Sequence, residues 1–330
     1  MTKKVAVVGA IDQTAIDILE KRTDIDYQLI EDESEPKLIE AVKDVDAILV
    51  RTTIISAKVI ESADKLKVIS RHGVGFDNID IDALNKRGIP LALAIGSNDE
   101  SVAEQAMFLI LSLCKQGALY HKAVCDGRFD YRQRPNSTEL RGKSILIIGF
   151  GRTGKQVASR ATGFKMNIFA IDPYIDQKEI ENYGVTPVTK LDSILSTLDI
   201  ITLHCPLTSE TQYMINKSIF AKMKSSALII NTARGGIINE DDLLYSLTNY
   251  QIAGAGLDVF ENEPPDSNNP LLKLPNVMLS PHCAGVTKES LVAMAKISAM
   301  NLLAGLDGDL TEEVVVNPQT LNQKHHKLRE

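Results

Sequence analysis

Ser144-Ile-Leu-Ile-Ile-Gly149-Phe-Gly-Arg-Thr-Gly154 is the stretch that decides the fold of this chain. The apolar run before the glycines predicts a buried strand, and the run after them, Lys155-Gln-Val-Ala-Ser-Arg-Ala-Thr, predicts a helix. A second strand, Asn167-Ile-Phe-Ala-Ile, leads to Asp172. Strand, glycine turn, helix and second strand with a terminal acid is the order of a dinucleotide site. A purely structural βαβ turn is the alternative interpretation.

The three glycines and the acid each have a physical role in such a site. Gly149 permits the tight turn, Gly151 lets the backbone approach a pyrophosphate, and Gly154 lets the helix pack closely on the strand. The helix that follows offers free N–H groups and the positive end of its dipole to the phosphates. Asp172 can accept hydrogen bonds from the ribose hydroxyls, and it favours NAD over NADP because a 2′-phosphate would meet a carboxylate.

Composition limits the class of protein and its partners. A chain of 330 residues with 44% apolar and 24% charged residues is globular and long enough for two domains. The net charge of −7 and a pI near 5.5 leave no basic footprint for nucleic acid. Four scattered cysteines disfavour a zinc site or a disulfide framework and favour a reducing cytosol: Cys114, Cys125, Cys205 and Cys283. We see no signal-like or bilayer-spanning apolar stretch, so we expect a cytoplasmic protein without a metal or a membrane partner.

Strand-like and helix-like segments alternate on both sides of the glycine stretch, which predicts parallel sheets covered by helices. About five strands are expected in the first hundred residues, and six from Ser144 onward, the count of a complete dinucleotide domain. The first sheet lacks the glycine fingerprint because Gly9 is followed by Ala-Ile-Asp. A long helix from Thr287 to Ala304 is expected to stop at Gly305. The predicted fold class is therefore α/β, with two doubly wound parallel-sheet domains.

A helix after residue 100 is apolar on nearly every face. Ser101 and Glu104 fit a capping box, with Ser101 as the N-cap. Because a surface helix of one subunit cannot be buried all round, this helix is either central in its domain or the core of a dimer interface. The segment that follows, Tyr120 to Arg141, is polar and predicts an extended arm.

Three polar side chains follow the last three predicted strands. Arg234 comes after one strand, Glu263 after the next, and His282 after the last. In an open α/β sheet the ligand crevice lies outside the carboxyl ends of the strands, so we expect the three to converge beside a nicotinamide. Singly, each has a plainer interpretation, as a surface arginine, a loop acid and a packed or capping histidine.

Together the three side chains fit a hydride-transfer site. Oxidising an alcohol to a ketone releases a hydride to the nicotinamide and a proton to a base, and a neutral histidine suits that base near neutral pH. A carboxylate beside the imidazole favours its charged form and fixes its tautomer. The planar fork of arginine suits a carboxylate held by two hydrogen bonds and polarises the adjacent carbonyl.

With these motifs the chain resembles the D-isomer-specific 2-hydroxyacid dehydrogenase family. The resemblance runs from about Val50 to Pro318 and rests on six motifs. They are the Arg71-His-Gly-Val-Gly-Phe-Asp-Asn-Ile-Asp loop, Asn98 to Glu104, the glycine stretch, Asn231-Thr-Ala-Arg-Gly-Gly, Leu257-Asp-Val-Phe-Glu-Asn-Glu-Pro and Pro281-His-Cys-Ala-Gly. Taken by itself, the loop from Arg71 can also be a plain turn.

The resemblance implies a role for each matched residue. His282 would be the acid/base, Glu263 its partner, and Arg234 the ligand of the substrate carboxylate and carbonyl. Val74 and Gly75 would present backbone N–H groups to that carboxylate, and Asp258 would face the nicotinamide carboxamide. The rest of the NAD site would be lined by Arg152, Thr153, Asp172, Cys205, Thr232 and Ala233.

The family also implies discontinuous domains: a flavodoxin-like substrate domain of residues 1–99 and 287–330, with a Rossmann NAD-binding domain of residues 100–286 inserted in it. It implies a homodimer formed through the cofactor domain. The chain is most similar to the phosphoglycerate dehydrogenase branch, through Arg51-Thr-Thr and the Arg71 loop. It ends soon after Pro318, so we expect no C-terminal regulatory domain. It also departs from the branch in having Phe129 where tryptophan is usual.

Two arginines bear on the identity of the substrate. Arg51 and Arg71 each follow a predicted strand, and together they supply more positive charge than one carboxylate needs. We therefore expect a second anionic group on the acid, with 3-phosphoglycerate favoured and 3-sulfolactate, or a hydroxypyruvate or glyoxylate type of substrate, as alternatives. The other interpretation is that these arginines pair with Asp77 or Asp80. A binding protein of another class, an NAD-sensing corepressor, keeps the same three site residues and stays open.

Overall fold

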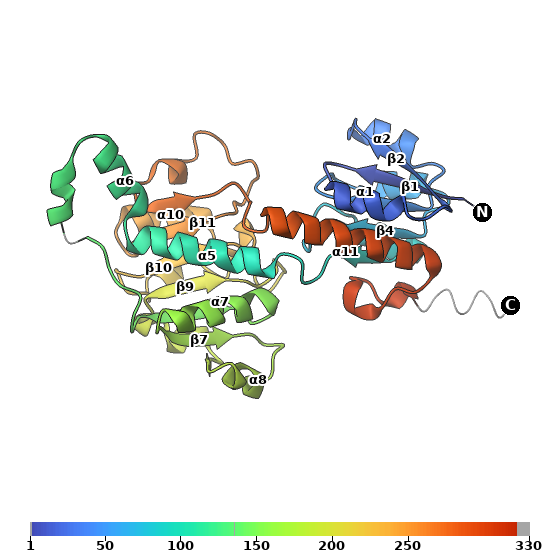
Figure 1. The fold of residues 1–330 in the computed structure, drawn as a ribbon. Coiled ribbons are helices and arrows are strands. Elements are labelled where there is room, and N and C mark those ends of the chain that lie inside the picture. Colours follow the sequence, from blue (N-terminus) through green and yellow to red (C-terminus); the bar gives the residue numbers. More distant parts are fainter. Residues whose placement is uncertain (1, 135, 322–330) are drawn as a thin grey trace. The chain divides into compact units, whose positions relative to one another are not determined.

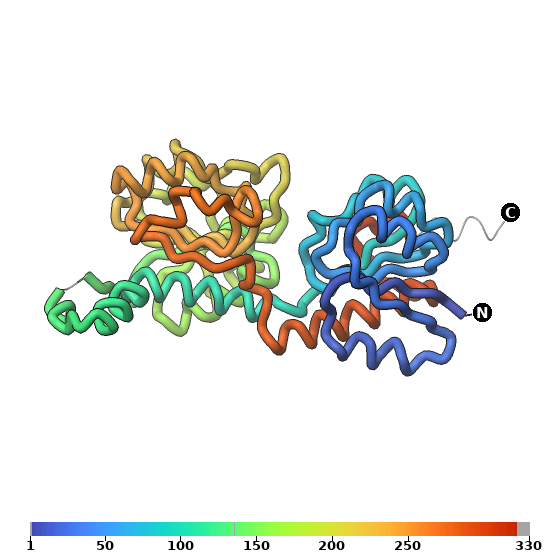
Figure 2. The backbone as a smooth tube through the Cα atoms, turned by 90° about the horizontal axis from the view of Figure 1, so that it is seen from above, coloured from blue at the N-terminus to red at the C-terminus, as the bar shows by residue number. Residues whose placement is uncertain are grey.

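The computed structural model describes residues 2–134 and 136–321. The chain divides into two compact units: unit 1 comprises Met1–Asn98 with Val286–Glu330, and unit 2 comprises Asp99–Gly285. Figure 2 lets the reader follow the chain out of unit 1 after its blue segment and back into it for the red C-terminal helix. Unit 1 is therefore built from both ends of the chain, and unit 2 from one continuous stretch.

Unit 1 is a five-stranded parallel sheet in the order β2-β1-β3-β4-β5. This order is the flavodoxin-like one, which confirms the predicted architecture. The strands are β1 Lys3–Val8, β2 Ile25–Ile30, β3 Ala47–Val50, β4 Val68–Arg71 and β5 Leu91–Leu93. The helices between them are α1 Gln13–Leu19, α2 Glu35–Ala41, α3 Ala57–Ser62 and α4 Ile81–Arg87. A short 3-10 turn, η6 Glu312–Val314, lies near the end of the described chain.

The last helix of unit 1, α11 (Lys288–Asp307), covers one face of the sheet (Figure 1). The predicted stop at Gly305 is wrong, because α11 continues to Asp307 and ends on Gly308, whose φ is +89°. Gly305 is instead a packing residue, since a Cβ there would lie 2.6 Å from Val68 Cγ2. By length and composition α11 alone among the described helices could cross a membrane. Its buried residues belong to the core of unit 1: Ala295, Ala299, Leu302 and Leu306.

Unit 2 is a seven-stranded parallel sheet in the order β12-β11-β10-β9-β6-β7-β8. Six of its strands were predicted: β6 Ser144–Ile148, β7 Asn167–Ile171, β9 Ile200–Leu203, β10 Leu228–Asn231, β11 Gly254–Leu257 and β12 Val277–Leu279. The seventh, β8 Thr186–Pro187, was missed because two residues, one of them proline, carry no periodic signal. The order around β6 is that of a dinucleotide-binding domain, which confirms the Rossmann prediction.

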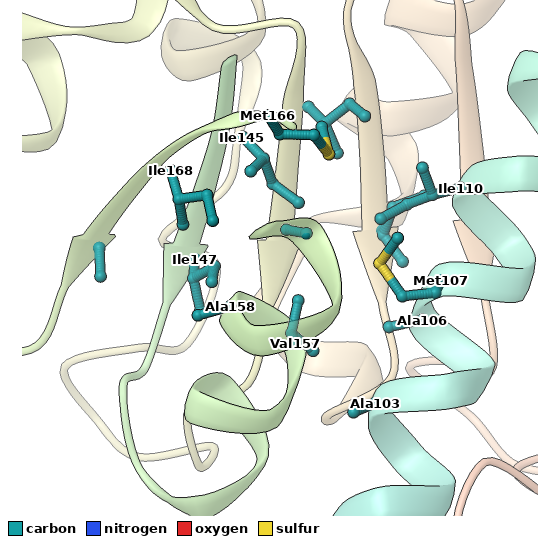
Figure 3. Packing of buried hydrophobic residues seen from close by; sticks show 14 of the residues in the cluster. Ala103, Ala106, Met107, Ile110, Ile145, Ile147, Val157, Ala158, Met166 and Ile168 are labelled. Carbon is teal, nitrogen blue, oxygen red and sulfur yellow. The ribbon is translucent and has the colours of Figure 1, made fainter. Parts of the chain in front are cut away.

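The sheet of unit 2 is covered on both faces. The helices are α5 Asp99–Cys114, α6 Gly117–Cys125, α7 Arg152–Gly163, α8 Gln177–Asn182, α9 Lys217–Phe220 and α10 Glu240–Thr248. Short 3-10 turns are η1 Phe129–Gln133, η2 Leu191–Ser193, η3 Leu195–Thr197, η4 Gly235–Ile237 and η5 Pro270–Lys273. Figure 3 shows one core, where Ala106 and Ile110 of α5 and Val157 of α7 lie with Ile145 and Ile147 of β6.

Two predictions for the first part of unit 2 need correction. Ser101 is not an N-cap, because α5 already begins at Asp99, and Asp99 and Glu100 place negative charge at the positive end of the helix. The segment after α5 is not fully extended, because α6 and η1 give it helical structure. Phe108 on α5 is 48% exposed in the single chain, so a dimer interface there stays a prediction.

Candidate active site and cofactor site

The loop between β6 and α7 is tightly packed at Gly149 and Gly154 and open at Gly151, as a pyrophosphate-binding loop requires. Gly149 has a φ of +92°, and a Cβ there would lie 2.6 Å from the His204 carbonyl. A Cβ on Gly154 would lie 2.2 Å from Gly149 O, so helix and loop touch only because both residues are glycine. Gly151 has the opposite surroundings: a Cβ there meets nothing within 4 Å, and no side chain caps the helix it precedes. The free end of α7 is therefore open to an anion.

Asp172 is held beside this loop by backbone hydrogen bonds. Its Oδ2 accepts from Phe150 N–H at 2.8 Å, and its Oδ1 accepts from Tyr174 N–H at 2.9 Å. A carboxylate fixed next to the glycine turn fits the ribose of a dinucleotide. Arg152 and Thr153 occupy the first two positions of α7, and the Arg152 side chain is 66% exposed, 4.0 Å from Asp99.

The other predicted cofactor residues follow the neighbouring strands β9 and β10. Cys205 lies just after β9, and burial raises the pKa of its thiol to about 11, so the residue is neutral. Beside it, burial lowers the pKa of His204 to about 3. Thr232 and Ala233 follow β10, and the Thr232 hydroxyl is buried without a hydrogen-bond partner in residues 2–134 and 136–321. An orphaned hydroxyl, an open helix end and a fixed acid fit a bound dinucleotide.

The three predicted catalytic residues lie in unit 2 after β10, β11 and β12. His282 Nδ1 and Glu263 Oε2 are 2.6 Å apart, and both side chains are partly exposed. The other carboxylate oxygen of Glu263 accepts from Phe260 N–H at 3.0 Å. Burial alone would raise the pKa of Glu263, but these hydrogen bonds and the charges of His282 and Arg234 outweigh it and lower that pKa. Glu263 is therefore an anion across the neutral range.

The turn that carries His282 is organised by Asp258, whose structural role sequence reasoning missed. The Asp258 side chain is fully buried, and its carboxylate accepts from Ser280 Oγ at 2.6 Å, Cys283 N–H at 3.0 Å and Ala284 N–H at 2.9 Å. The His282 N–H donates to Asp258 O at 2.7 Å, and His282 has a φ of +50°, in the left-handed region. The Asp258 carboxylate is therefore already bonded to this turn. If it also contacts a nicotinamide carboxamide, as the sequence predicts, it does so while keeping these hydrogen bonds.

The loop that carries Arg234 is shaped by its neighbours. Asn231 Oδ1 accepts from Ala233 N–H at 3.0 Å, and its Nδ2 donates to Arg234 O at 2.8 Å. Arg234 Nη1 donates to Ala233 O at 2.7 Å. Sequence reasoning placed Asn231 in a motif without assigning it a role, and an amide at the last position of a buried strand is the signal that could have indicated one.

The other predicted substrate residues lie in unit 1, at or just after the carboxyl ends of the adjacent strands β3 and β4. Arg51 Nη1 donates to Ala10 O at 3.0 Å, and Arg71 Nη1 donates to His72 O at 3.1 Å. Arg71 folds over Gly73, where a Cβ would lie 1.5 Å from its Nη1. Within residues 2–134 and 136–321, no group accepts a hydrogen bond from the N–H of Val74 or Gly75.

The alternative partner Asp80 is already engaged. Its carboxylate accepts from Ala83 N–H at 2.9 Å and so caps α4. In the part of the chain that the structure describes, no three His, Cys, Asp or Glu side chains cluster closely enough to hold a metal ion.

Comparison with known proteins supplies the family. Residues 107–284 match the model for "D-isomer specific 2-hydroxyacid dehydrogenase, NAD binding domain". The chain is 40% identical to D-3-phosphoglycerate dehydrogenase of Methanocaldococcus jannaschii, over 99% of this chain and 62% of that protein. It is 38% identical to glyoxylate reductase of Thermofilum pendens, over 94% of both chains. The chain thus spans about three-fifths of the length of the first relative and 58% of a second, from Archaeoglobus fulgidus.

The chain is also similar to a solved structure. A glyoxylate reductase from Paecilomyes thermophila superposes with a TM-score of 0.87 at 28% identity, covering 96% of this chain and 99% of that one.

Proposed function

Because this chain belongs to the D-isomer-specific 2-hydroxyacid dehydrogenase family, we propose that it interconverts a D-2-hydroxy acid and its 2-oxo acid with NAD. The observation that carries the proposal is the 2.6 Å contact between His282 Nδ1 and Glu263 Oε2. That pair lies in the unit whose residues match an NAD-binding domain, on loops after adjacent strands. Family and geometry support the same reaction class.

The chain's own residues would manage the proton. When bound, NAD supplies or accepts the hydride. Since Nδ1 of His282 faces Glu263, its Nε2 is left to take the proton of the substrate hydroxyl during oxidation, or to return it during reduction. The lowered pKa of Glu263 keeps a negative charge beside the imidazole, which stabilises the imidazolium formed by oxidation.

The remaining site residues would bind and orient the two molecules. Arg234 would hold the substrate carboxylate and polarise its carbonyl, with the N–H groups of Val74 and Gly75 as further donors. The glycine loop with Arg152 and Thr153 would hold the pyrophosphate, and Asp172 the ribose. Cys205, Thr232, Ala233 and Asp258 would line the rest of the cofactor site.

For the substrate itself, we propose an acid with a second anionic group, and 3-phosphoglycerate is favoured. Arg51 follows β3 and Arg71 is the last residue of the paired strand β4, with Val50 aligned to Arg71, so their charges add at one edge of the unit 1 sheet. The relatives named phosphoglycerate dehydrogenase support this choice. 3-Sulfolactate is the alternative with the same charge pattern. A hydroxypyruvate or glyoxylate type of substrate is supported by the glyoxylate reductase that matches along 94% of both chains.

Three broader expectations belong to the same proposal. The protein would act in the cytoplasm, without nucleic acid or a membrane as partner, and as a homodimer through unit 2. An NAD-sensing corepressor would also bind NADH, so turnover separates the two classes of protein. A corepressor should reduce 2-oxo acids poorly, whereas a dehydrogenase should turn them over.

The test is an NADH-oxidation screen over 2-oxo acids with phosphate, sulfonate, carboxylate or apolar tails. We expect 3-phosphohydroxypyruvate to give a higher kcat/KM than pyruvate or hydroxypyruvate. Arg51→Ala and Arg71→Ala should erase that preference mainly through KM. A wild-type protein that prefers apolar or uncharged tails would refute the second anion, and one that binds NADH without turning over any 2-oxo acid would refute the enzyme.

A further inference from the structure

Two loops of unit 2 carry Arg234 and Glu263, the two charged residues of the site besides His282. Segment 234–240 runs from Arg234 to the first residue of α10, and segment 260–263 ends at Glu263. Near Arg234 the two segments touch backbone to backbone. A Cβ on Gly235 would lie 1.9 Å from the carbonyl carbon of Phe260 and 2.4 Å from Glu261 N, so only glycine fits.

At the other end the segments are joined by a reciprocal pair of hydrogen bonds. Glu240 N–H donates to Glu261 Oε1 at 2.7 Å, and Glu261 N–H donates to Glu240 Oε1 at 2.7 Å. Each glutamate thus satisfies the backbone donor of the other. Bonds between a backbone N–H and a carboxylate are charge-assisted and stronger than neutral ones.

The outer oxygens of the same two carboxylates are also bound. Glu240 Oε2 accepts from Asn269 Nδ2 at 3.2 Å, and Glu261 Oε2 accepts from Tyr213 OH at 3.3 Å. The charge of Glu261, followed by burial and this hydrogen bond, raises the pKa of Tyr213, so the phenol stays a donor. With both oxygens engaged, neither glutamate is free to rotate away.

We infer that Glu240 and Glu261 are positioning residues, which fix the 260–263 turn so that the Glu263 carboxylate meets His282. Glu261 adjoins Phe260, whose N–H donates to Glu263 Oε1 at 3.0 Å, while Glu263 Oε2 lies 2.6 Å from His282 Nδ1. The reciprocal pair therefore stands one residue from the bond that orients the acid. This inference rests on the proposed function.

A purely structural alternative is that Glu261 only caps α10, whose first N–H it accepts. The two roles differ in what a double mutant does. If Glu261 acts through Glu263, then its loss is harmless once Glu263 has been disabled. If Glu261 only stabilises the fold, the two effects multiply.

The experiment measures kcat, KM for NADH and thermal unfolding for Glu240→Ala and Glu261→Ala, each alone and combined with Glu263→Gln. We expect each alanine variant to lose up to about tenfold in kcat, no more than Glu263→Gln itself, with KM for NADH nearly unchanged, because a slightly misplaced group costs rate rather than cofactor affinity. Each double variant should have the kcat of Glu263→Gln alone. Glu261→Gln should keep most of the activity, since an amide oxygen still accepts the α10 N–H.

Asp241→Ala is the matched control, because it removes a carboxylate from the same turn of α10 which, among the residues that the structure describes, makes no hydrogen bond to the 260–263 turn. Its kcat should be that of the wild type. If Glu261→Ala unfolds, Glu240→Ala gives the same cycle and leaves the α10 cap in place. Normal kcat in the alanine variants, or multiplying effects in the double variants, would overturn the inference. A wild type without 2-oxo acid reductase activity would instead overturn the proposed function.

Discussion

The first strand-to-helix loop of each unit begins with a glycine at positive φ, but the helix that follows is capped differently in the two units. In unit 1 the loop after β1 starts with Gly9 at a φ of +88°, and in unit 2 the loop after β6 starts with Gly149 at +92°. The next helix of unit 1 is capped by Asp12, whose carboxylate accepts from Thr14 N–H at 3.0 Å. The corresponding cap in unit 2 is Gly151, with no side chain to fill the space.

The difference explains why one sheet edge suits a dinucleotide and the other does not. In unit 1 the Asp12 side chain already occupies the helix end with a negative charge, and a hollow of about 440 Å³ beside Gly9 is lined by Glu31 and Glu33. A phosphate in that hollow would meet the carboxylates of Glu31 and Glu33. In unit 2 the helix end is open, so its N–H groups and dipole are available to an anion. One side chain at the cap position thus separates two loops of equal topology.

The largest expected effect tests whether the chemistry belongs to the unit 2 edge. His282→Asn should lower turnover by roughly 100-fold or more, the range for a lost general acid/base, and leave NADH binding nearly intact. Steady-state rates with NADH fluorescence titration measure both quantities. Near-normal turnover in His282→Asn would show that His282 is not the general acid/base.

The partner of His282 should give a smaller, pH-dependent effect. Glu263→Gln should cost about tenfold in the reduction direction, the rate equivalent of a charge-assisted hydrogen bond worth ~1.5 kcal/mol. Because the variant no longer favours the protonated imidazole, the loss should grow as pH rises and the alkaline limb should move to lower pH.

The lowered pKa of Glu263 also predicts how wild type and Glu263→Gln differ at acidic pH. The pKa of Glu263 is lowered, so its charge is present above the ordinary carboxyl range and is lost only as pH falls through that lowered value. The difference between wild type and Glu263→Gln should therefore persist through mildly acidic pH. Identical pH–rate profiles would show that Glu263 is not the partner.

Adding a single methyl group at Gly154 should distort the cofactor loop of unit 2. Gly154→Ala places a Cβ 2.2 Å from Gly149 O, and overpacking of this kind costs about 1–3 kcal/mol. If the strain falls on the cofactor loop, the Kd for NADH should rise about tenfold. Gly163→Ala is the matched control on the same helix, because its Cβ meets nothing within 4 Å. Equal Kd values for the two variants would contradict the packing role of Gly154.

The smallest effect belongs to the unit 1 loop. Asp12→Ala should lower Tm by on the order of a few degrees through the lost cap and leave NADH affinity unchanged. Hydrogen bonds from the Thr14 side chain and backbone lower the pKa of Asp12, so its stabilisation is present at neutral pH and is lost as pH falls through that lowered pKa. Thermal melts of wild type and Asp12→Ala should therefore differ at neutral pH and converge at acidic pH. A weakened NADH affinity would mean that the two loops are not functionally different.

Most of the fold could be predicted because the strands are short apolar runs between clear turn residues. The failures share a cause, which is that one residue type serves several purposes. The sequence predicts Gly305 as a helix stop, yet the residue lies inside α11, where Val68 of β4 comes too close for a side chain. Ser101 was taken as a cap, yet the acidic residues before it begin the helix. Such choices are made by tertiary packing, which local sequence does not contain.

The site divides in the same way. The residues proposed to contact a ligand carry chemistry that the sequence reveals: it predicts that Glu263 and His282 converge, and His282 Nδ1 lies 2.6 Å from Glu263 Oε2. The residues that hold them were not predicted. Asp258 binds the His282 turn through backbone N–H groups, and Glu240 and Glu261 bind each other across 21 positions of sequence. Contacts made to backbone atoms leave no signature in the residue types of their partners.

The two-part construction of unit 1 has a consequence for the order in which the protein folds during synthesis. The five strands of unit 1 are translated before unit 2, but the core on one face of their sheet includes Ala295, Ala299 and Leu302 of α11, which is translated only after unit 2. Unit 2 is continuous and complete at Gly285. We therefore expect unit 2 to reach its native state before unit 1, because the apolar face of the unit 1 sheet stays uncovered until α11 has been translated.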